Sequence, residues 1–188
     1  KYVTSDTETA TVPVRKEHAV VEREPITVIL SQRGWIRAMK GHVELASAET
    51  LKFKEGDGPA FAFHAQTTDK LLLAAANGRF YTVPANTLPG GRGLGEPLRL
   101  MIDLPNDAAV LDMFPWREDQ QFLVASKAGD GFIVNAPDIL AQTRAGKQVL
   151  NGEALLVRRV EGDHLATVGD NRKLLVFPLS ELPEMARG

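Results

Sequence analysis

Four stretches of this chain share one layout, and this repetition constrains the fold more than any single residue does. Each stretch has an apolar β-type run, a tight polar turn, a second β-type run and then a glycine-containing basic loop. The four stretches are Ile26–His42, Leu71–Val83, Gln121–Val134 and His164–Phe177. They recur at intervals of roughly 43 to 51 residues, which is the range of blade-type repeats. The sequence therefore predicts an array of about four repeated units.

The turn inside each stretch falls at an equivalent position. These turns are Gly34, Asn77-Gly78, Ala128-Gly129 and Asn171-Arg172. Glycine adopts positive φ without steric cost, and Asn-Gly between apolar runs is the strongest short signal for a β-hairpin. We therefore expect one hairpin in each repeat.

Further β-type runs lie between the predicted hairpins, and each follows a turn marked by Gly or Pro. These runs are Ala60–His64, Ala109–Phe114 and Ala154–Val160. No segment keeps a 3.6-residue apolar period over the length of an ordinary helix, so helix should be scarce. The pattern indicates an all-β, propeller-like array, with a closed ring and an open arc fitting equally well. The expected blade repeats lie near residues 26–57, 58–103, 104–150 and 151–188.

Residues 1–24 differ from the repeats in composition. They are polar and rich in Ser, Thr and Glu, and their one apolar cluster is Ala19-Val20-Val21. This composition favours a linker or arm that leads into the first repeat at Pro25. A short strand at Ala19–Glu22 is the alternative, because similar apolar runs precede the later hairpins.

Composition and charge exclude several classes of protein. The chain is 44% hydrophobic and 24% charged, as expected for an ordinary globular protein, and it has no cysteine for a disulfide or a thiolate metal site. No apolar run approaches the roughly 20 residues of a membrane span, so we expect no membrane partner and a cytoplasmic location. The net charge of -2 and the pI of about 6.1 argue against a wholly basic nucleic-acid binder.

Catalytic motifs are also missing from the sequence. The run Gly90–Gly95 is followed by Glu96-Pro97 where a dinucleotide-binding helix should begin, and Gly146-Lys147 lacks the rest of a phosphate-binding P-loop. No Ser lies in a nucleophile elbow, and the four histidines show no metal-ligand spacing. We therefore predict no catalytic residue, no metal site and no cofactor in this chain.

Basic residues are placed less randomly than the net charge suggests. They gather in the turns and glycine loops of the repeats, whereas acidic residues gather near the N-terminus and in the turns between hairpins. One basic feature per repeat along a shared rim would suit contact with the phosphates of a curved duplex, independent of base sequence. Solvated turn residues are the alternative interpretation. The candidate DNA-binding residues are Arg33, Arg37, Lys40, His42, Arg79, Arg92, Arg99, Lys127, Arg144, Lys147, Arg172, Lys173 and Arg187.

Several of these stretches resemble a known family in their amino-acid sequence. Glu24–His42, Thr87–Leu98, Phe122–Val134 with the Arg144–Lys147 loop, and Leu174–Pro183 look like the C-terminal domains of the A subunit of bacterial topoisomerase IV. The homologous gyrase A domains are more distant relatives. The resemblance runs from about Glu22 to Gly188, and it implies a β-pinwheel, in which propeller-like blades exchange strands with their neighbours.

The resemblance also implies a function. In that family a basic outer rim binds and bends duplex DNA, so the chain would be a non-catalytic module that positions the transported segment and sets topological preference in decatenation and supercoil relaxation. Its partners would be double-stranded DNA, the A-subunit dimer and the B subunit, in the bacterial cytoplasm at the nucleoid. The catalytic tyrosine, ATP and Mg²⁺ would belong to other domains, so Tyr2 and Tyr81 are not expected to attack DNA.

Two departures from the family pattern qualify that expectation. The family's domain continues beyond the Glu181–Pro183 segment, so the resemblance implies that one or more final blades are missing here. The basic glycine box of gyrase has no match, because the chain reads VELASAET after His42. A propeller-like scaffold that binds a protein partner is the alternative function, although the WD and kelch signatures are absent.

Overall fold

The computed structural model describes residues 20–188 and shows an all-β chain with thirteen strands and five short 3-10 helices. The described residues contain no α-helix, as the missing 3.6-residue period predicted. The strands are β1 (Pro25–Ser31), β2 (Trp35–Lys40), β3 (Pro59–Gln66), β4 (Lys70–Ala75), β5 (Arg79–Pro84), β6 (Glu96–Pro97), β7 (Val110–Pro115), β8 (Gln121–Ser126), β9 (Gly131–Asn135), β10 (Lys147–Gln148), β11 (Ala154–Arg159), β12 (His164–Val168) and β13 (Leu174–Pro178). The 3-10 helices are η1 (Leu45–Thr50), η2 (Ala85–Thr87), η3 (Leu98–Leu100), η4 (Ala136–Ile139) and η5 (Leu179–Glu181).

All four predicted hairpins are present, with turns of one kind. Gly34, Gly78, Gly129 and Arg172 have φ angles of 81°, 75°, 96° and 61°, and Arg172 is the one described non-glycine residue at positive φ. In each turn the backbone N–H of that residue donates to the carbonyl three positions earlier, at distances of 2.8 to 3.1 Å. The predicted turn positions are therefore confirmed in all four repeats.

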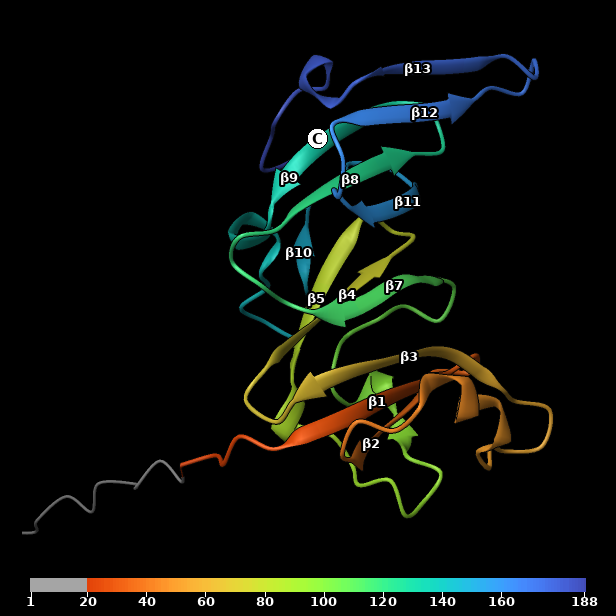
Figure 1. Ribbon diagram of the computed structural model, residues 1–188, viewed down its shortest axis with the longest axis vertical. Coiled ribbons are helices and arrows are strands. Elements are labelled where there is room, and N and C mark those ends of the chain that lie inside the picture. Colours follow the sequence, from red (N-terminus) through yellow and green to blue (C-terminus); the bar gives the residue numbers. More distant parts are fainter. Residues whose placement is uncertain (1–19) are drawn as a thin grey trace, which may run out of the picture.

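The hairpins assemble into four antiparallel sheets that succeed one another along the long axis of the molecule (Figure 1). Sheet A has the order β3-β1-β2-β6, sheet B has β10-β5-β4-β7, sheet C has β11-β8-β9, and sheet D is the hairpin β12-β13. The first strand of each of the first three hairpins pairs with the strand that immediately precedes the next hairpin in the chain. Each of these sheets therefore combines strands from two neighbouring sequence repeats.

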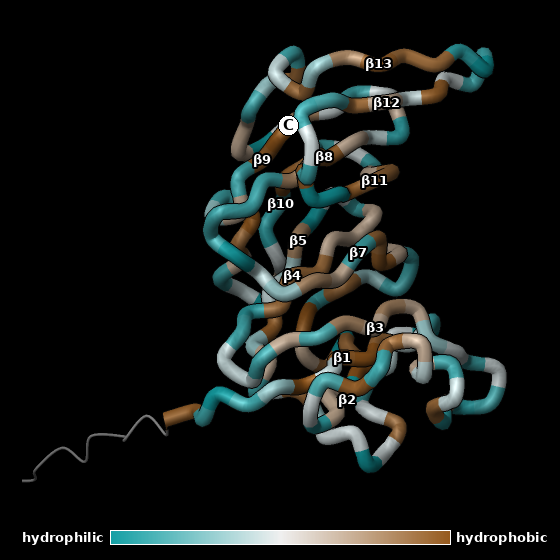
Figure 2. Tube along the Cα trace, in the orientation of Figure 1, coloured by the Kyte–Doolittle hydropathy of each residue, from teal (hydrophilic) through white to brown (hydrophobic). Residues whose placement is uncertain are grey.

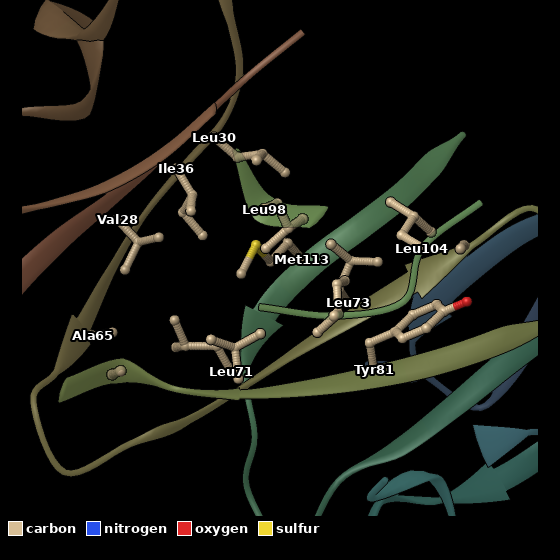
Figure 3. Close-up of a cluster of buried hydrophobic side chains, with 14 of the residues drawn as sticks. Val28, Leu30, Ile36, Ala65, Leu71, Leu73, Tyr81, Leu98, Leu104 and Met113 are labelled. Carbon is tan, nitrogen blue, oxygen red and sulfur yellow. The ribbon is translucent and has the colours of Figure 1, made fainter. Parts of the chain in front are cut away.

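Two hydrophobic cores lie between the first three sheets. The core between sheets A and B contains Val28, Leu30 and Ile36 opposite Leu71 and Leu73, and Figure 3 shows how these side chains converge. The core between sheets B and C contains residues of β8, β9 and β11, with Phe122 and Phe132 among the larger side chains. Burial of this apolar surface is the main force that holds the sheets together.

Strand β4 contributes to both cores. Leu71, Leu73 and Ala75 point into the core shared with sheet A, whereas Leu72 and Ala74 point into the core shared with sheet C. Successive side chains of a strand alternate between its two faces, so one continuous apolar run fills both interfaces. This explains why LLLAAA lacks the polar alternation of a half-exposed strand.

Sheet D differs from the other three in its exposure. None of its residues belongs to either core, and Val168, Leu174, Leu175 and Val176 are each more than half exposed. Figure 2 shows β13 as a hydrophobic stretch at the top edge of the view. Sheet D is therefore an apolar hairpin without a covering layer among the described residues.

The N-terminal prediction is tested in part. Residues 1–19, which hold most of the predicted linker, lie outside the described residues. Residues 20–24 form no strand, and the side chain of Val20 is 92% exposed. Over residues 20–22, the alternative strand at Ala19–Glu22 is therefore not formed.

Candidate functional site

A short segment from the following repeat lies along the outer edge of the second strand of each of the first three hairpins. Glu96-Pro97 of β6 pairs with β2, and Lys147-Gln148 of β10 pairs with β5. At β9 the backbone of Ile133 bonds to Pro183 and Met185 on either side of Glu184. These three pairings place the glycine loops of the sequence beside hairpins that precede them by many residues.

The candidate cations are brought together by the same pairings. The first three groups combine residues of one hairpin with residues of the segment on its outer edge, the fourth lies on a hairpin alone, and we call all four groups the cationic edges. They comprise Arg33, Arg37, Lys40, Arg92 and Arg99 at β2 and β6, Arg79, Arg144 and Lys147 at β5 and β10, Lys127 and Arg187 at β9, and Arg172 and Lys173 at the β12–β13 turn.

Arg37 differs from the other candidates in its burial. Its side chain is only 5% exposed, and its guanidinium donates to the carbonyl oxygens of Gly93 at 2.7 Å and Lys52 at 2.9 Å. Burial lowers the pKa of Arg37 from its ordinary value. Arg37 therefore ties two loops to β2 and presents little of its surface to a duplex.

Other candidates are partly occupied by protein partners. Arg99 donates to the carbonyl oxygens of Pro105 and Asn106, while its buried Nε has no partner in residues 20–188. Arg144 lies 3.5 Å from Asp103, and Lys127 pairs with Glu153. These contacts position the loops and reduce the positive charge that the side chains present.

The remaining cations are freer to meet an anion. Within residues 20–188, eleven of the thirteen candidates make no ion pair with a carboxylate, and seven of them remain once Arg33, Arg37, His42 and Arg99 are set aside for their other contacts. Arg79 instead donates to the carbonyl oxygen of Ala145 at 3.1 Å, and Arg187 donates to Asn151. The seven are Lys40, Arg79, Arg92, Lys147, Arg172, Lys173 and Arg187.

Arg33 is exposed but has an acidic neighbour that the sequence pattern did not reveal. Its backbone N–H donates to Oδ1 of Asp57 at 3.0 Å, although the two residues are far apart in sequence. Burial tends to raise the pKa of Asp57, but hydrogen bonds from Ser31, Gly58 and Arg33 and the charge of Arg33 outweigh it, so the pKa lies below its ordinary value. The stretch Ser31–His42 contains no acidic residue in sequence, but the fold places Asp57 beside it.

His42 lies beside a second histidine rather than with the cations. Its ring stacks on that of His64 with centroids 4.5 Å apart, and its Nε2 lies 3.1 Å from the carbonyl oxygen of Ala65. Nε2 of His64 lies 2.6 Å from the carbonyl oxygen of Val43. The pair fastens the chain after β2 to strand β3.

The glycines of the basic loops have a role within the protein. A Cβ on Gly91 would lie 2.7 Å from Cγ of Met39, and a Cβ on Gly146 would lie 2.7 Å from the carbonyl oxygen of Phe80. Gly95 has a φ of 89°, and a Cβ there would overlap the carbonyl oxygen of Ile36. These glycines let the loops pack closely on β2 and β5, so their conformation is explained without a ligand.

A segment that no sequence motif marked lies beside the first cationic edge. Residues 44–58, which we call the strap, contain η1 and follow β2. Lys52 accepts the hydrogen bond from Arg37 through its carbonyl, and Nζ of Lys54 lies 3.4 Å from the centre of the Trp35 ring. The alternation Lys-Phe-Lys at 52–54 was the available signal, but its position between predicted blades hid it.

Within the described part of the chain, no cluster of three or more His, Asp or Glu residues could hold a metal ion. None of the helices in that part has the length and apolar character needed to cross a bilayer.

Comparison with known proteins identifies relatives by sequence. The family described as DNA gyrase C-terminal domain, beta-propeller, matches residues 69–117 and 163–188. The A subunit of DNA topoisomerase 4 from Caulobacter vibrioides is 51% identical over 174 residues, which is 90% of this chain and 22% of the relative. The Escherichia coli K12 protein of the same name is 35% identical over 178 residues, or 92% of this chain and 23% of the relative. The chain thus spans less than a quarter of the length of these relatives.

Solved structures agree with the sequence matches. The E. coli ParC C-terminal domain has a TM-score of 0.80 at 35% identity, with 88% of this chain and 69% of that chain covered. A DNA gyrase A C-terminal domain has a TM-score of 0.62 at 17% identity, with 86% and 58% covered, and supports the fold alone. The predicted all-β, propeller-type fold is confirmed by these comparisons and by the four sheets.

Proposed function

The chain belongs to the family of C-terminal domains of the topoisomerase IV A subunit, and from that premise we propose that it binds duplex DNA through its cationic edges. The observation that supports this most is the pairing of loops with preceding hairpins. It places Arg92 beside β2 and Lys147 beside β5, so that cations distant in sequence become neighbours. Such cations would neutralise backbone phosphates without reading base sequence.

The proposed contacts are with the phosphates of a duplex that curves from one edge to the next. The residues we assign to direct contact pair with no described carboxylate and lack the burial or the particular loop contacts that set Arg33, Arg37 and Arg99 aside; they are Lys40, Arg92, Arg79, Lys147, Arg172, Lys173 and Arg187. Arg33, Arg99, Lys127 and Arg144 would contribute less, and Arg37 would act by holding loops. The duplex would bend because it contacts several cationic edges in turn.

In the whole enzyme, this binding would position the transported DNA segment and bias the reaction toward particular crossings or supercoils. The domain would carry no catalytic residue and no cofactor of its own. The A-subunit dimer, the B subunit, ATP and Mg²⁺ would supply the chemistry elsewhere, and the enzyme would work on the chromosome in the bacterial cytoplasm.

Salt-dependent binding tests the proposal. The 188-residue chain should bind duplexes of unrelated sequence with similar affinity, and log affinity should fall against log salt with a slope of about -0.9 per phosphate contacted. Lys147→Glu should weaken binding to all duplexes alike, because Lys147 lies on a cationic edge and pairs with no carboxylate of residues 20–188. Arg23→Glu is the matched control, since Arg23 is exposed and lies before the first hairpin. A chain that fails to bind duplex DNA at low salt would contradict the proposal.

One observation favours a second candidate function, a scaffold that binds a protein partner. Sheet D exposes Val168, Leu174 and Val176 on one face and Leu175 on the other, and exposed apolar surface often marks a protein contact. Leu175→Lys should then abolish capture of that partner in the absence of DNA and leave duplex affinity unchanged. Retained capture by Leu175→Lys would exclude sheet D as the contact.

A further inference from the structure

A small pocket opens between the strap and the loop of residues 89–95, which we call the glycine loop. Its volume is about 260 Å³, and its lining residues are Arg37, Leu51, Lys52, Gly91, Arg92, Gly93 and Leu94. The glycine loop is fixed to β2 by the hydrogen bond from the N–H of Ala38 to the carbonyl of Pro89 at 2.9 Å. Both segments lie next to the β1–β2 hairpin at the base of Figure 1. The pocket therefore has walls that are anchored to the sheet.

The charges that line this pocket all have one sign. Arg37, Lys52 and Arg92 are cationic, and none of the lining residues is acidic. Arg37 is almost fully buried, and it makes no ion pair with any carboxylate of residues 20–188. Its charge is compensated by two carbonyl dipoles and the face of the Phe53 ring but by no described carboxylate, which leaves an excess of positive potential. An anion in the pocket would be attracted by all three cations.

The backbone of the glycine loop adds hydrogen-bond donors. The N–H groups of Arg92 and Leu94 donate to no backbone acceptor within residues 20–188, and that of Gly93 closes a turn. A Cβ on Gly93 would meet only the backbone N of Gly95, at 3.9 Å, so little protein crowds this residue. Free backbone N–H groups in a loop beside cationic side chains are a common setting for phosphate.

We propose that this pocket seats one phosphate group of a DNA backbone, with Lys52 and Arg92 as its outer contacts and Arg37 as its fixed floor. The proposal rests on the proposed function and narrows it to one position on the first cationic edge. The volume of about 260 Å³ and the exposed position suit a single phosphate that remains linked to a longer chain. The chemistry recognised is that of phosphate, so free polyphosphates would compete for the same position.

Lys52→Ala, Arg92→Ala and the double variant test whether the two side chains grip one phosphate. Each single change should weaken duplex binding by about fivefold, as expected for exposed ionic contacts. Because both cations hold the same group, the double variant should lose about tenfold rather than the product of the two losses. Its log–log salt slope should fall by about 0.9, the value for one phosphate. Arg23→Ala, an exposed cation outside the pocket, should change neither quantity.

A second measurement uses pyrophosphate and the amide NMR spectrum of the 188-residue chain. Pyrophosphate should shift the amide signals of Arg92, Gly93 and Leu94 in a saturable way, and the double variant should lose that response. Arg37 is left unchanged because its replacement would disturb the fold of both walls.

The outcomes separate this proposal from the proposed function. If the affinity loss of the double variant equals the product of the two single losses, and its log–log salt slope falls by about 1.8, the two side chains contact two different phosphates. That result would overturn the proposal of one shared phosphate. If the double variant binds duplex DNA as tightly as the unchanged chain, the pocket is not a phosphate site. The proposed binding of DNA by the rest of the chain would be unaffected. A response to pyrophosphate without any duplex binding would overturn the DNA-backbone assignment together with the proposed function.

Discussion

Arg37 brings a positive charge into the first blade, where it joins three segments of the chain. Its two hydrogen bonds connect β2 to the strap and to the glycine loop, and its guanidinium lies 5.3 Å from the centre of the Phe53 ring. The sequence predicted a DNA-binding cation, because Arg37 lies with Arg33 and Lys40 in a basic stretch of the first repeat. A local excess of basic residues does not show that the strap covers one of them.

Arg37→Met should lower the free energy of unfolding by about 1 to 3 kcal/mol. The substitution leaves two carbonyl oxygens, of Gly93 and Lys52, without their donors, and an unsatisfied buried polar group costs about that much. Denaturant unfolding measures the change. Lys40→Met on the same strand is the control, because Lys40 is exposed and should alter stability little. Equal effects of the two substitutions would contradict the loop-joining role.

Two aspartates should give opposite pH dependences of stability. Burial raises the pKa of Asp112 above its ordinary value of 3.8, against the lowering effects of the Met113 N–H and of Arg158. The charged form is therefore disfavoured in the folded state, and the resulting penalty is complete above the raised pKa and absent below 3.8. Asp112→Asn should raise the unfolding free energy at about pH 7, with the gain fading as the pH falls through that window.

Asp57→Asn should show the opposite pH dependence of stability to Asp112→Asn. The pKa of Asp57 is lowered, so its contribution to stability is present above the ordinary value of 3.8 and is lost as the pH falls through the folded value. Asp57→Asn should therefore reduce the unfolding free energy at about pH 7 and have less effect in acid. Denaturant unfolding at several pH values follows both variants, and parallel pH profiles for the two would refute the assignment.

At the scale of elements, the hairpins and the two-residue edge strands differ in how far the sequence predicted them. The hairpins were predictable because Gly34, Gly78 and Gly129 mark turns between runs of apolar residues. Strands β6 and β10 are two residues long, and Glu-Pro and Lys-Gln carry no strand signal of their own. Their pairing with β2 and β5 depends on tertiary packing, so the grouping of cations along edges could not be read from local pattern.

Gly95→Ala should weaken the attachment of the glycine loop to β2. The substitution strains a backbone at a φ of 89° and also brings a Cβ onto the carbonyl of Ile36, so the loop must move. Gly41→Ala is a close control, because Gly41 has a φ of 79° and open space around its Cβ position. Gly95→Ala should destabilise the chain more than Gly41→Ala by denaturant unfolding. Similar losses would mean that dihedral strain alone is responsible.

At the scale of the whole molecule, stability should not be uniform from one sheet to the next. Sheets A, B and C share two cores, whereas sheet D contributes no residue to either. Amide hydrogen exchange should therefore be slowest in β4 and β8 and much faster in β12 and β13. Protection in sheet D equal to that in β4 would contradict this gradient.

The double burial of β4 has a consequence for how the blades unfold. In a row of units that touch only their neighbours, each interface can be lost separately, and the ends can open while the middle persists. Here Leu71 and Leu72 are successive residues of one strand, yet they belong to different cores. If β4 detaches from sheet B, both cores lose part of their packing at the same time. The first three sheets should therefore melt in one cooperative transition, with β4 as the element that couples them.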